Sequence, residues 1–250
     1  MTLKSSIKKV TPKPVWNFLR HYRNIIQDRI SNGGSALCHI GYCGYDLWYG
    51  AGDILIKKIR NGRIFEEKMC TAIVSELQMP DPVFLDVGAN IGLISLYVAS
   101  QLPQTKIYAF EPGPQQHRLF DMTIDKNALQ SRIALSSQAL GNKEGSVTFI
   151  THFSPDSSGD GFFDTGRAGE PIPVEVEMIT LDMWWKRANQ PAINVMKLDT
   201  EGSELWILEG AVEFLEKMRP TIFLEIEPKN LAVYPHTRDD IFVWFTEHGY

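Results

Sequence analysis

The stretch VFLDVGANIG, residues 83–92, decides the fold that this sequence predicts. It opens with β-branched and aromatic residues that favour a strand, and it ends in small residues that let the backbone turn tightly. Gly88 and Gly92 permit positive φ and a close approach by a ligand. Asn90 is placed to cap a helix over residues 91–102, whose apolar residues recur at helical spacing. The stretch therefore predicts a buried strand, a glycine turn and a helix.

A second strand, KIYAFEP at residues 106–112, follows this helix and places Glu111 23 positions after Gly88. An acidic side chain at this point of a β-α-β unit can accept hydrogen bonds from both hydroxyls of a ribose. Asn90 stands where the dinucleotide fingerprint has its second glycine, the one that lets pyrophosphate rest against the backbone. The pattern therefore disfavours NAD and FAD. It favours a nucleoside without phosphates, with S-adenosylmethionine (SAM) as the leading candidate.

The elements after this unit alternate as in a doubly wound α/β sheet. Strands at residues 146–152 and 174–180 interrupt the alternation and can pair across a loop of about twenty residues, a length that is usually functional. We interpret this loop as a lid or wall on the substrate side. The other predicted strands cover residues 133–140, 193–199 and 221–227, and the other predicted helices cover residues 64–77, 115–129, 204–218 and 239–248.

Length and composition fit one α/β domain with an N-terminal extension. The chain has 250 residues, 44% of them hydrophobic, which is enough for a single substantial core. It has no apolar run that could span a bilayer, no secretory signal pattern, and three cysteines too unevenly placed for a disulfide framework, so we expect a cytoplasmic protein. The net charge is −5 although residues 1–30 are basic, and an acidic body disfavours nucleic acid as a substrate.

The predicted N-terminal extension, residues 1–62, has three parts. Residues 15–30 form a basic amphipathic helix that either sits on an anionic membrane surface or a partner protein, or docks on its own domain. Residues 32–53 are rich in glycine and aromatic residues and predict irregular structure or short strands. Residues 54–59, ILIKKI, predict a short strand.

Four segments carry a resemblance to a known family: FLDVGANIG (84–92), AFEP (109–112), VMKLDTEGSELWILEGA (195–211) and RPTIFLEIEP (219–228). Together they resemble the FkbM-type branch of the class I SAM-dependent methyltransferases, over residues 64–250. The resemblance implies a Rossmann-like, mostly parallel sheet that binds SAM. It also implies, as usual in the family, methylation of a hydroxyl on a sugar, a polyketide or another small metabolite. The methyltransferase domain would cover residues 63–250, with an insertion at 146–180.

The resemblance also implies a set of cofactor-binding residues. Those after the first strand would line the methionine and ribose side of SAM, Glu111 would hold the ribose hydroxyls, and those after the third strand would lie near the adenine. The residues assigned are Asp86, Gly88, Asn90, Gly92, Glu111, Gln138 and Asn142.

One departure from the family concerns the end of the sheet. Class I methyltransferases close the sheet with an antiparallel hairpin after the last helix, and this sequence stops at Gly249 and Tyr250, where the hairpin would begin. We therefore expect the C-terminal β-hairpin to be lacking. Either the sequence is a truncated form, or another element covers the fifth strand, because an uncovered edge strand is prone to aggregation.

Carboxylates follow several predicted strands and should meet beyond the carboxyl ends of the sheet, where ligands bind. Methyl transfer requires alignment of the acceptor oxygen and removal of its proton. We expect Asp199 or Glu201 to act as the base or to orient the acceptor. The alternative is that Asp199 holds the SAM amine or caps the next helix, while Glu201 and Glu204 serve that helix's first turn. His152 and His236 are reserve bases.

A metal is not predicted, although Asp199, Glu201 and Glu225 offer the oxygen ligands that Mg²⁺ takes. Cys38 and Cys43 lack a second ligand pair at a suitable spacing.

The sequence leaves three candidate functions. The leading one is a SAM-dependent O-methyltransferase acting on a small-molecule hydroxyl. The second is a nicotinamide-dependent oxidoreductase, disfavoured by the glycine turn and by the absence of a Tyr-x-x-x-Lys motif. The third is an inactive or truncated SAM-fold binding protein.

Overall fold

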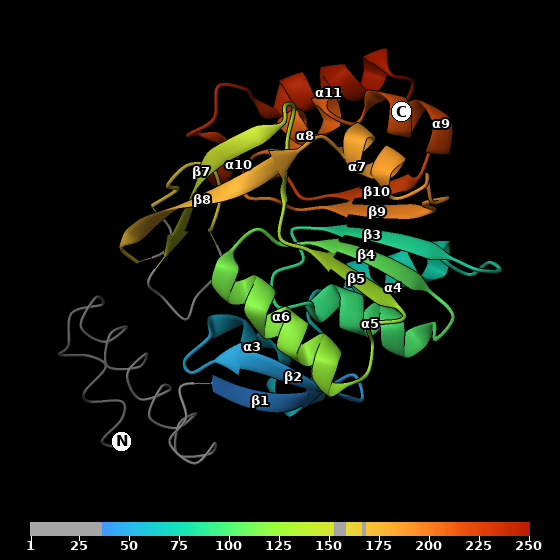
Figure 1. Cartoon of the computed structure of the whole chain (residues 1–250), viewed down its shortest axis with the longest axis vertical. Helices are drawn as coiled ribbons and strands as arrows, with labels where there is room; N and C mark the ends of the chain where they lie inside the picture. The colour runs from blue at the N-terminus through green and yellow to red at the C-terminus, as the bar shows by residue number, and fades with distance from the viewer. Residues whose placement is uncertain (1–36, 153–158, 167–168) are drawn as a thin grey trace, which may run out of the picture.

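A parallel five-stranded sheet forms the centre of the protein in the computed structural model, which describes residues 37–152, 159–166 and 169–250. The strand order is β10-β9-β3-β4-β5, and helices cover both faces (Figure 1). The strands are β3 (Val83–Val87), β4 (Lys106–Phe110), β5 (Ile133–Ser136), β9 (Val195–Leu198) and β10 (Thr221–Leu224). The order reverses at β3, so the predicted doubly wound, Rossmann-like sheet is confirmed. The helix predicted at residues 15–30 lies outside the described residues.

The two faces of the sheet carry separate hydrophobic clusters. Phe84 is buried in one cluster and Leu85 in the other, because side chains of a strand alternate between faces. Both are fully buried, which explains why β3 is apolar except for Asp86. One face carries α4 (Glu67–Glu76), α5 (Leu93–Gln101) and α6 (Pro114–Lys126), and the other carries α7 (Leu181–Arg187), α8 (Glu204–Glu209), α9 (Val212–Met218) and α11 (Arg238–Glu247) (Figure 1).

The turn between β3 and α5 differs from its prediction. Gly92, at φ +88°, is the N-terminal cap residue of α5, so the helix starts two residues later than expected. Asn90 lies earlier in the turn at φ +51°, and its Oδ1 accepts a hydrogen bond from the Ile91 N–H at 2.8 Å. The prediction that Asn90 caps the helix was therefore wrong, because its side chain bonds inside the turn.

The helix predicted over residues 204–218 is divided into α8 and α9. Gly210 ends α8, and a Cβ at this position would lie 2.1 Å from the backbone oxygen of Gly141. The chain packs there too closely for any side chain, and Ala211 then has non-helical torsions before α9 begins. Periodicity across the break stays helical, which is why the sequence predicts one element.

The described part of the N-terminal extension packs on the central domain. β1 (Leu37–Tyr42) and β2 (Tyr45–Gly50) form an antiparallel hairpin, followed by α3 (Ile54–Ile59) and the 3₁₀ turn Arg60–Gly62. The strand predicted for ILIKKI was wrong, because Asp53 accepts the Leu55 N–H at 2.8 Å and caps a helix. Hairpin and helix share one hydrophobic cluster with α5 and α6, so the boundary predicted after residue 62 does not separate two cores.

The insertion forms a second, three-stranded sheet of order β6-β8-β7. Its strands are β6 (Ala139–Leu140), β7 (Gly145–His152) and β8 (Pro171–Ile179), and the predicted pairing of the last two is confirmed. The strand predicted at residues 133–140 is thus shared between two sheets.

The C-terminal region continues from β10 into α10 (Pro228–Leu231) and α11. Within the described ranges β10 is the edge strand of the central sheet, and no strand follows it. Ile222 and Leu224 of β10 and Phe245 of α11 pack against the same hydrophobic cluster, so this strand and this helix share a core on one face of the sheet. None of the helices seen in the described residues is long and apolar enough to cross a bilayer.

Candidate active site

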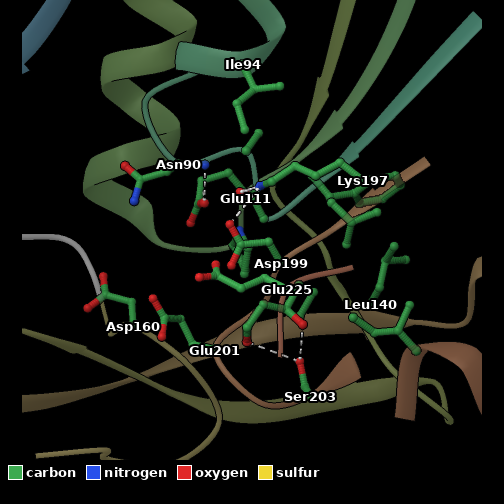
Figure 2. A pocket seen from close by; sticks show the side chains of 18 of the residues that line it. Asn90, Ile94, Glu111, Leu140, Asp160, Lys197, Asp199, Glu201, Ser203 and Glu225 are labelled. Carbon is green, nitrogen blue, oxygen red and sulfur yellow. Dashed lines mark hydrogen bonds and ion pairs between the residues drawn. The ribbon is translucent and has the colours of Figure 1, made fainter. Parts of the chain in front are cut away.

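A cavity of about 160 Å³ opens beyond the carboxyl ends of β3, β4, β9 and β10, where open α/β sheets bind their ligands (Figure 2). Its sides are apolar, with Ile94, Leu140 and Phe162 among the lining residues. The ionisable groups in its lining are six carboxylates and two lysines. They are Lys58, Glu66, Glu111, Asp160, Lys197, Asp199, Glu201 and Glu225. The cavity is therefore acidic, and its field favours a ligand with net positive charge.

The glycine turn forms the floor of the cavity and packs against the end of β9. Gly88 has φ +78°, and a Cβ on it would lie 1.8 Å from the backbone oxygen of Asp199. Only glycine fits this position, for both its torsion and its packing. The turn is thereby held at the switch point between β3 and β9.

Lys197 holds this floor together from β9. Its Nζ donates to the Gly88 carbonyl at 2.7 Å and lies 3.2 Å from Asp199 Oδ2 and 3.5 Å from Asp86 Oδ1. Burial alone would lower the pKa of Lys197, but the carboxylates of Asp199 and Asp86 outweigh it and raise the pKa above its usual value. The lysine is thus a buried cation that positions the turn. Sequence reasoning missed it, although a lysine inside the apolar strand INVMKLD was the available signal.

Glu111 faces the cavity from the end of β4. Its Oε2 accepts the Asn90 N–H and its Oε1 accepts the Gly113 N–H, both at 2.8 Å. Burial raises the pKa of Glu111 to about 7, against the effect of these two hydrogen bonds. A carboxylate oxygen has two lone pairs, so each can still accept a ligand hydroxyl. The arrangement suits the paired hydroxyls of a ribose.

Three more carboxylates of the cavity lining, Asp199, Glu201 and Glu225, are drawn below Glu111 in Figure 2. A hydrogen bond to Asp199, together with burial and the charge of Asp199, raises the pKa of Glu225 to about 8. These two carboxyl groups therefore share a proton near neutral pH. Glu201 has φ +59°, and its side chain accepts a hydrogen bond from Asn230 Nδ2. The group can accept a proton from, or orient, a ligand hydroxyl.

Of the alternative roles, the one predicted for Glu204 in the first turn of α8 is confirmed, and capping by Asp199 was wrong. Glu204 Oε1 accepts the Thr200 and Gly202 N–H groups, each at 3.1 Å, and so stabilises the turn before α8. Ser203, not Asp199, occupies the cap position of that helix. Asp199 and Glu201 remain lining residues of the cavity.

The remaining predicted cofactor residues divide into two groups. Gln138 lines the cavity, as do Gly88 and Asn90. Asp86, Gly92 and Asn142 do not line the cavity, and their contacts lie in the structure around it. Asp86 Oδ2 accepts the Ser95 hydroxyl at 2.6 Å under the turn, a Cβ on Gly92 would lie 2.2 Å from the Phe120 ring, and Asn142 donates to Glu209 at 2.8 Å on the surface.

Both reserve histidines are buried outside the cavity lining. His152 Nδ1 lies 2.9 Å from Asp160 Oδ1 and ties the described part of the insertion loop to β7. His236 Nε2 lies 2.9 Å from the Gly202 carbonyl oxygen. Both imidazoles hold chain segments in place. Over the described residues, no three His, Cys, Asp or Glu side chains are grouped so that they could hold a metal ion.

The fold and this cavity define a class: Rossmann-like α/β proteins with an acidic ligand cavity at the switch point of the sheet. The chain belongs to the FkbM methyltransferase family, because the profile of the Methyltransferase FkbM domain matches residues 86–250. The nicotinamide-dependent oxidoreductase is not favoured.

Individual relatives show moderate identity. 2-O-methyltransferase NoeI of Sinorhizobium fredii is 28% identical over 169 residues, 61% of this chain and 66% of the relative. Methyltransferase sdnD of Sordaria araneosa is 27% identical over 206 residues, 70% of this chain and 79% of the relative. 31-O-demethyl-FK506 methyltransferase FkbM of Streptomyces tacrolimicus is 26% identical over 163 residues, 54% of this chain and 61% of the relative. The matches thus span less than two thirds of NoeI and of FkbM.

Proposed function

We propose that the protein is a SAM-dependent O-methyltransferase that acts on a hydroxyl of a small molecule. The observation that carries this proposal is the acidic cavity with Glu111 at its ribose position. SAM carries a sulfonium, an ammonium and one carboxylate, so it is a net cation and complements six carboxylates. The pyrophosphate of a dinucleotide would bring negative charge against the same groups. Two relatives, NoeI and FkbM, are O-methyltransferases by name, which supports oxygen as the acceptor atom.

The chain's residues fit this cofactor. Glu111 has acceptor capacity for two hydroxyls, and Gly88 and Ala89 of the glycine turn line the cavity with it. Gln138 and Leu140 line the part of the cavity beyond β5, where the adenine would lie. SAM supplies an electrophilic methyl group.

Proton removal from the acceptor falls to Asp199 or Glu201. Asp199 lies 3.2 Å from Lys197 Nζ and is hydrogen-bonded to Glu225, whose pKa it raises, so it is held in place in the cavity lining. Glu201 is fixed by Asn230 and lies nearer Asp160 of the insertion loop (Figure 2). One of the two takes the proton, and the other orients the hydroxyl. General base catalysis contributes about 10²–10⁴-fold to such a step.

Calorimetric titration with SAM and with NADH tests the cofactor. We expect binding of SAM alone, and binding of NADH in place of SAM would overturn the proposal. Mass spectrometry of a cell extract incubated with the protein and methyl-labelled SAM then tests for turnover and identifies the acceptor. SAM binding without any labelled product would instead support a SAM-fold binding protein.

A matched pair of substitutions, Asp199→Asn and Glu201→Gln, locates the base. We expect one of them to lower kcat by about 10²-fold or more while SAM affinity stays within a few-fold. Full turnover in both variants would show that the base lies elsewhere.

A further inference from the structure

The cavity has a wall that comes from outside the matched methyltransferase domain. Leu55 and Lys58 of α3, with Phe65 and Glu66 just before α4, line it together with the glycine turn. These residues precede β3 in the chain, and the family profile begins only at residue 86. The N-terminal segment is therefore part of the site and not only a support for the domain.

Hydrogen bonds with Tyr42 and Cys70 fix the backbone at the corner formed by Phe65 and Glu66. The Phe65 N–H donates to Tyr42 Oη at 3.3 Å, and Cys70 Sγ donates to the Phe65 carbonyl at 3.1 Å. Glu66 has φ +45°, a left-handed conformation that is uncommon for a residue with a side chain. Lys58 Nζ lies 5.1 Å from the centre of the Phe65 ring, so the lysine is anchored to the same corner. The backbone of this corner and the lysine beside it are thus held at the rim, where Glu66 also lines the cavity.

The charges of this corner interact with Asp199 and Glu225 in the cavity. Loss of solvent and the negative charge of Asp199 raise the pKa of Glu66, whereas Lys197 and Lys58 oppose the rise. Glu66 in turn contributes to the raised pKa of Glu225. Glu66 therefore lies within electrostatic reach of Asp199 and Glu225. Lys197 already binds Gly88, Asp86 and Asp199, while Lys58 is exposed at the rim.

The position of this corner relative to Glu111 decides which part of a ligand can meet it. With the ribose at Glu111 and the adenine toward Gln138, the remaining part of SAM must extend the other way, over the glycine turn toward β9 and α4. That part is an amino acid, with an ammonium and a carboxylate on the same carbon. A carboxylate and a lysine that line the same wall of the cavity are complementary to these two groups.

We propose that Glu66 binds the ammonium and Lys58 binds the carboxylate of the amino-acid tail of SAM. This inference rests on the proposed function, since it names a subsite of the same cavity. It assigns the α3–α4 segment to cofactor recognition, leaving Asp199 and Glu201 for the acceptor. The methyl donor is then bound at both ends, by Glu111 at the ribose and by Glu66 and Lys58 at the amino-acid tail.

Two thioether ligands isolate the tail from the sulfonium charge. S-adenosylhomocysteine has the amino-acid tail, and methylthioadenosine has the same nucleoside and sulfur without it. In calorimetric titrations we expect Glu66→Gln and Lys58→Met each to weaken S-adenosylhomocysteine binding about tenfold or more, since each removes a charged hydrogen-bond partner. Binding of methylthioadenosine should stay within about twofold. The matched controls, Glu67→Gln and Lys57→Met, change exposed neighbours that do not line the cavity and should leave both affinities unchanged.

Each other outcome overturns a different statement. Unchanged S-adenosylhomocysteine binding in both variants, or equal losses for both ligands, would refute the tail subsite, the second by showing a general effect on the cavity. A wild-type protein that binds neither ligand nor SAM would refute the proposed function itself. Thermal unfolding of every variant checks that the losses do not come from misfolding.

Discussion

Replacing Lys197 with methionine tests whether a buried cation organises the site. The side chain of Lys197 is 3% exposed, and Asp86 beside it is fully buried. The substitution keeps an unbranched side chain of similar shape but removes the cation beside the buried Asp86, a change that costs about 3–5 kcal/mol in buried ion pairs. The Gly88 carbonyl also loses its donor, which costs about 1–3 kcal/mol. We expect the free energy of unfolding to fall by about 4 kcal/mol or more.

Urea denaturation of the purified variants measures this loss. For a chain of this size a 4 kcal/mol loss lowers the Tm by about 8–16 °C, so a thermal scan gives a second readout. The control is Lys106→Met in β4, because this lysine belongs to the same sheet but donates to Ser131 at the surface. Its effect should stay within about 1 kcal/mol.

The double variant Lys197→Met with Asp86→Asn distinguishes charge from packing. If the loss comes from an uncompensated carboxylate, neutralising Asp86 should relieve it. The double variant should then lose less free energy of unfolding than the two single variants lose together, by about 1–3 kcal/mol. Strictly additive losses, or a Lys197→Met variant as stable as the wild type, would refute the assignment of Lys197 as the organising cation.

Three further predictions concern the turn and the two titrating acids. Gly88→Ala should abolish SAM binding in calorimetry and lower stability, because its Cβ would lie 1.8 Å from the Asp199 oxygen; normal affinity would contradict the packing described. Glu111→Gln should gain stability relative to the wild type as pH rises from about 5 to 8 in urea titrations. The pKa of Glu111 is raised from 4.5 to about 7, so the folded wild type binds a proton that the unfolded chain has released. The free energy of unfolding of the wild type therefore falls as pH rises through this range, by up to about 3 kcal/mol. A pH-independent difference between the two proteins would contradict this. If Asp199 is the base, Glu225→Gln should remove a rise in kcat near pH 8 that the wild type shows, because the carboxyl with the pKa of about 8 is gone; identical pH–rate profiles would exclude a shared proton.

The central sheet could be predicted because its signals are local. The apolar run of β3 and the glycines after it specify strand and turn within ten residues, and Glu111 follows at a spacing set by one helix and one strand. Alternation of elements then gives the order of strands in a doubly wound sheet. The same rules failed at ILIKKI, where a hydrophobic run short enough for a strand is instead a helix capped by Asp53 and packed on the central core.

The wall of the cavity at Lys58 and Glu66 could not be predicted in the same way. Neither residue belongs to a motif, and both lie on a segment whose secondary structure was assigned wrongly or only in part. Their place is decided by packing: Tyr42, on the hairpin, holds the corner beside the glycine turn. Contacts of this kind depend on the docking of whole elements, which a pattern along the chain does not encode.

Lys197 could be predicted in part, since its position depends both on local sequence signals and on packing between elements. The strand order predicts that residues 83–87 and 193–199 are neighbours, so a lysine in the second strand was bound to lie near the first. Its partner, however, depends on register: Asp86 and Lys197 are paired across β3 and β9. A shift by one residue would turn the lysine to the other face of the sheet, into an apolar cluster. The register is fixed by the packing at the strand ends, including the contact between Gly88 and the backbone of Asp199, which glycine alone allows. The glycine that the sequence marks as a ligand-binding turn is therefore also the residue that aligns the buried ion pair beneath it.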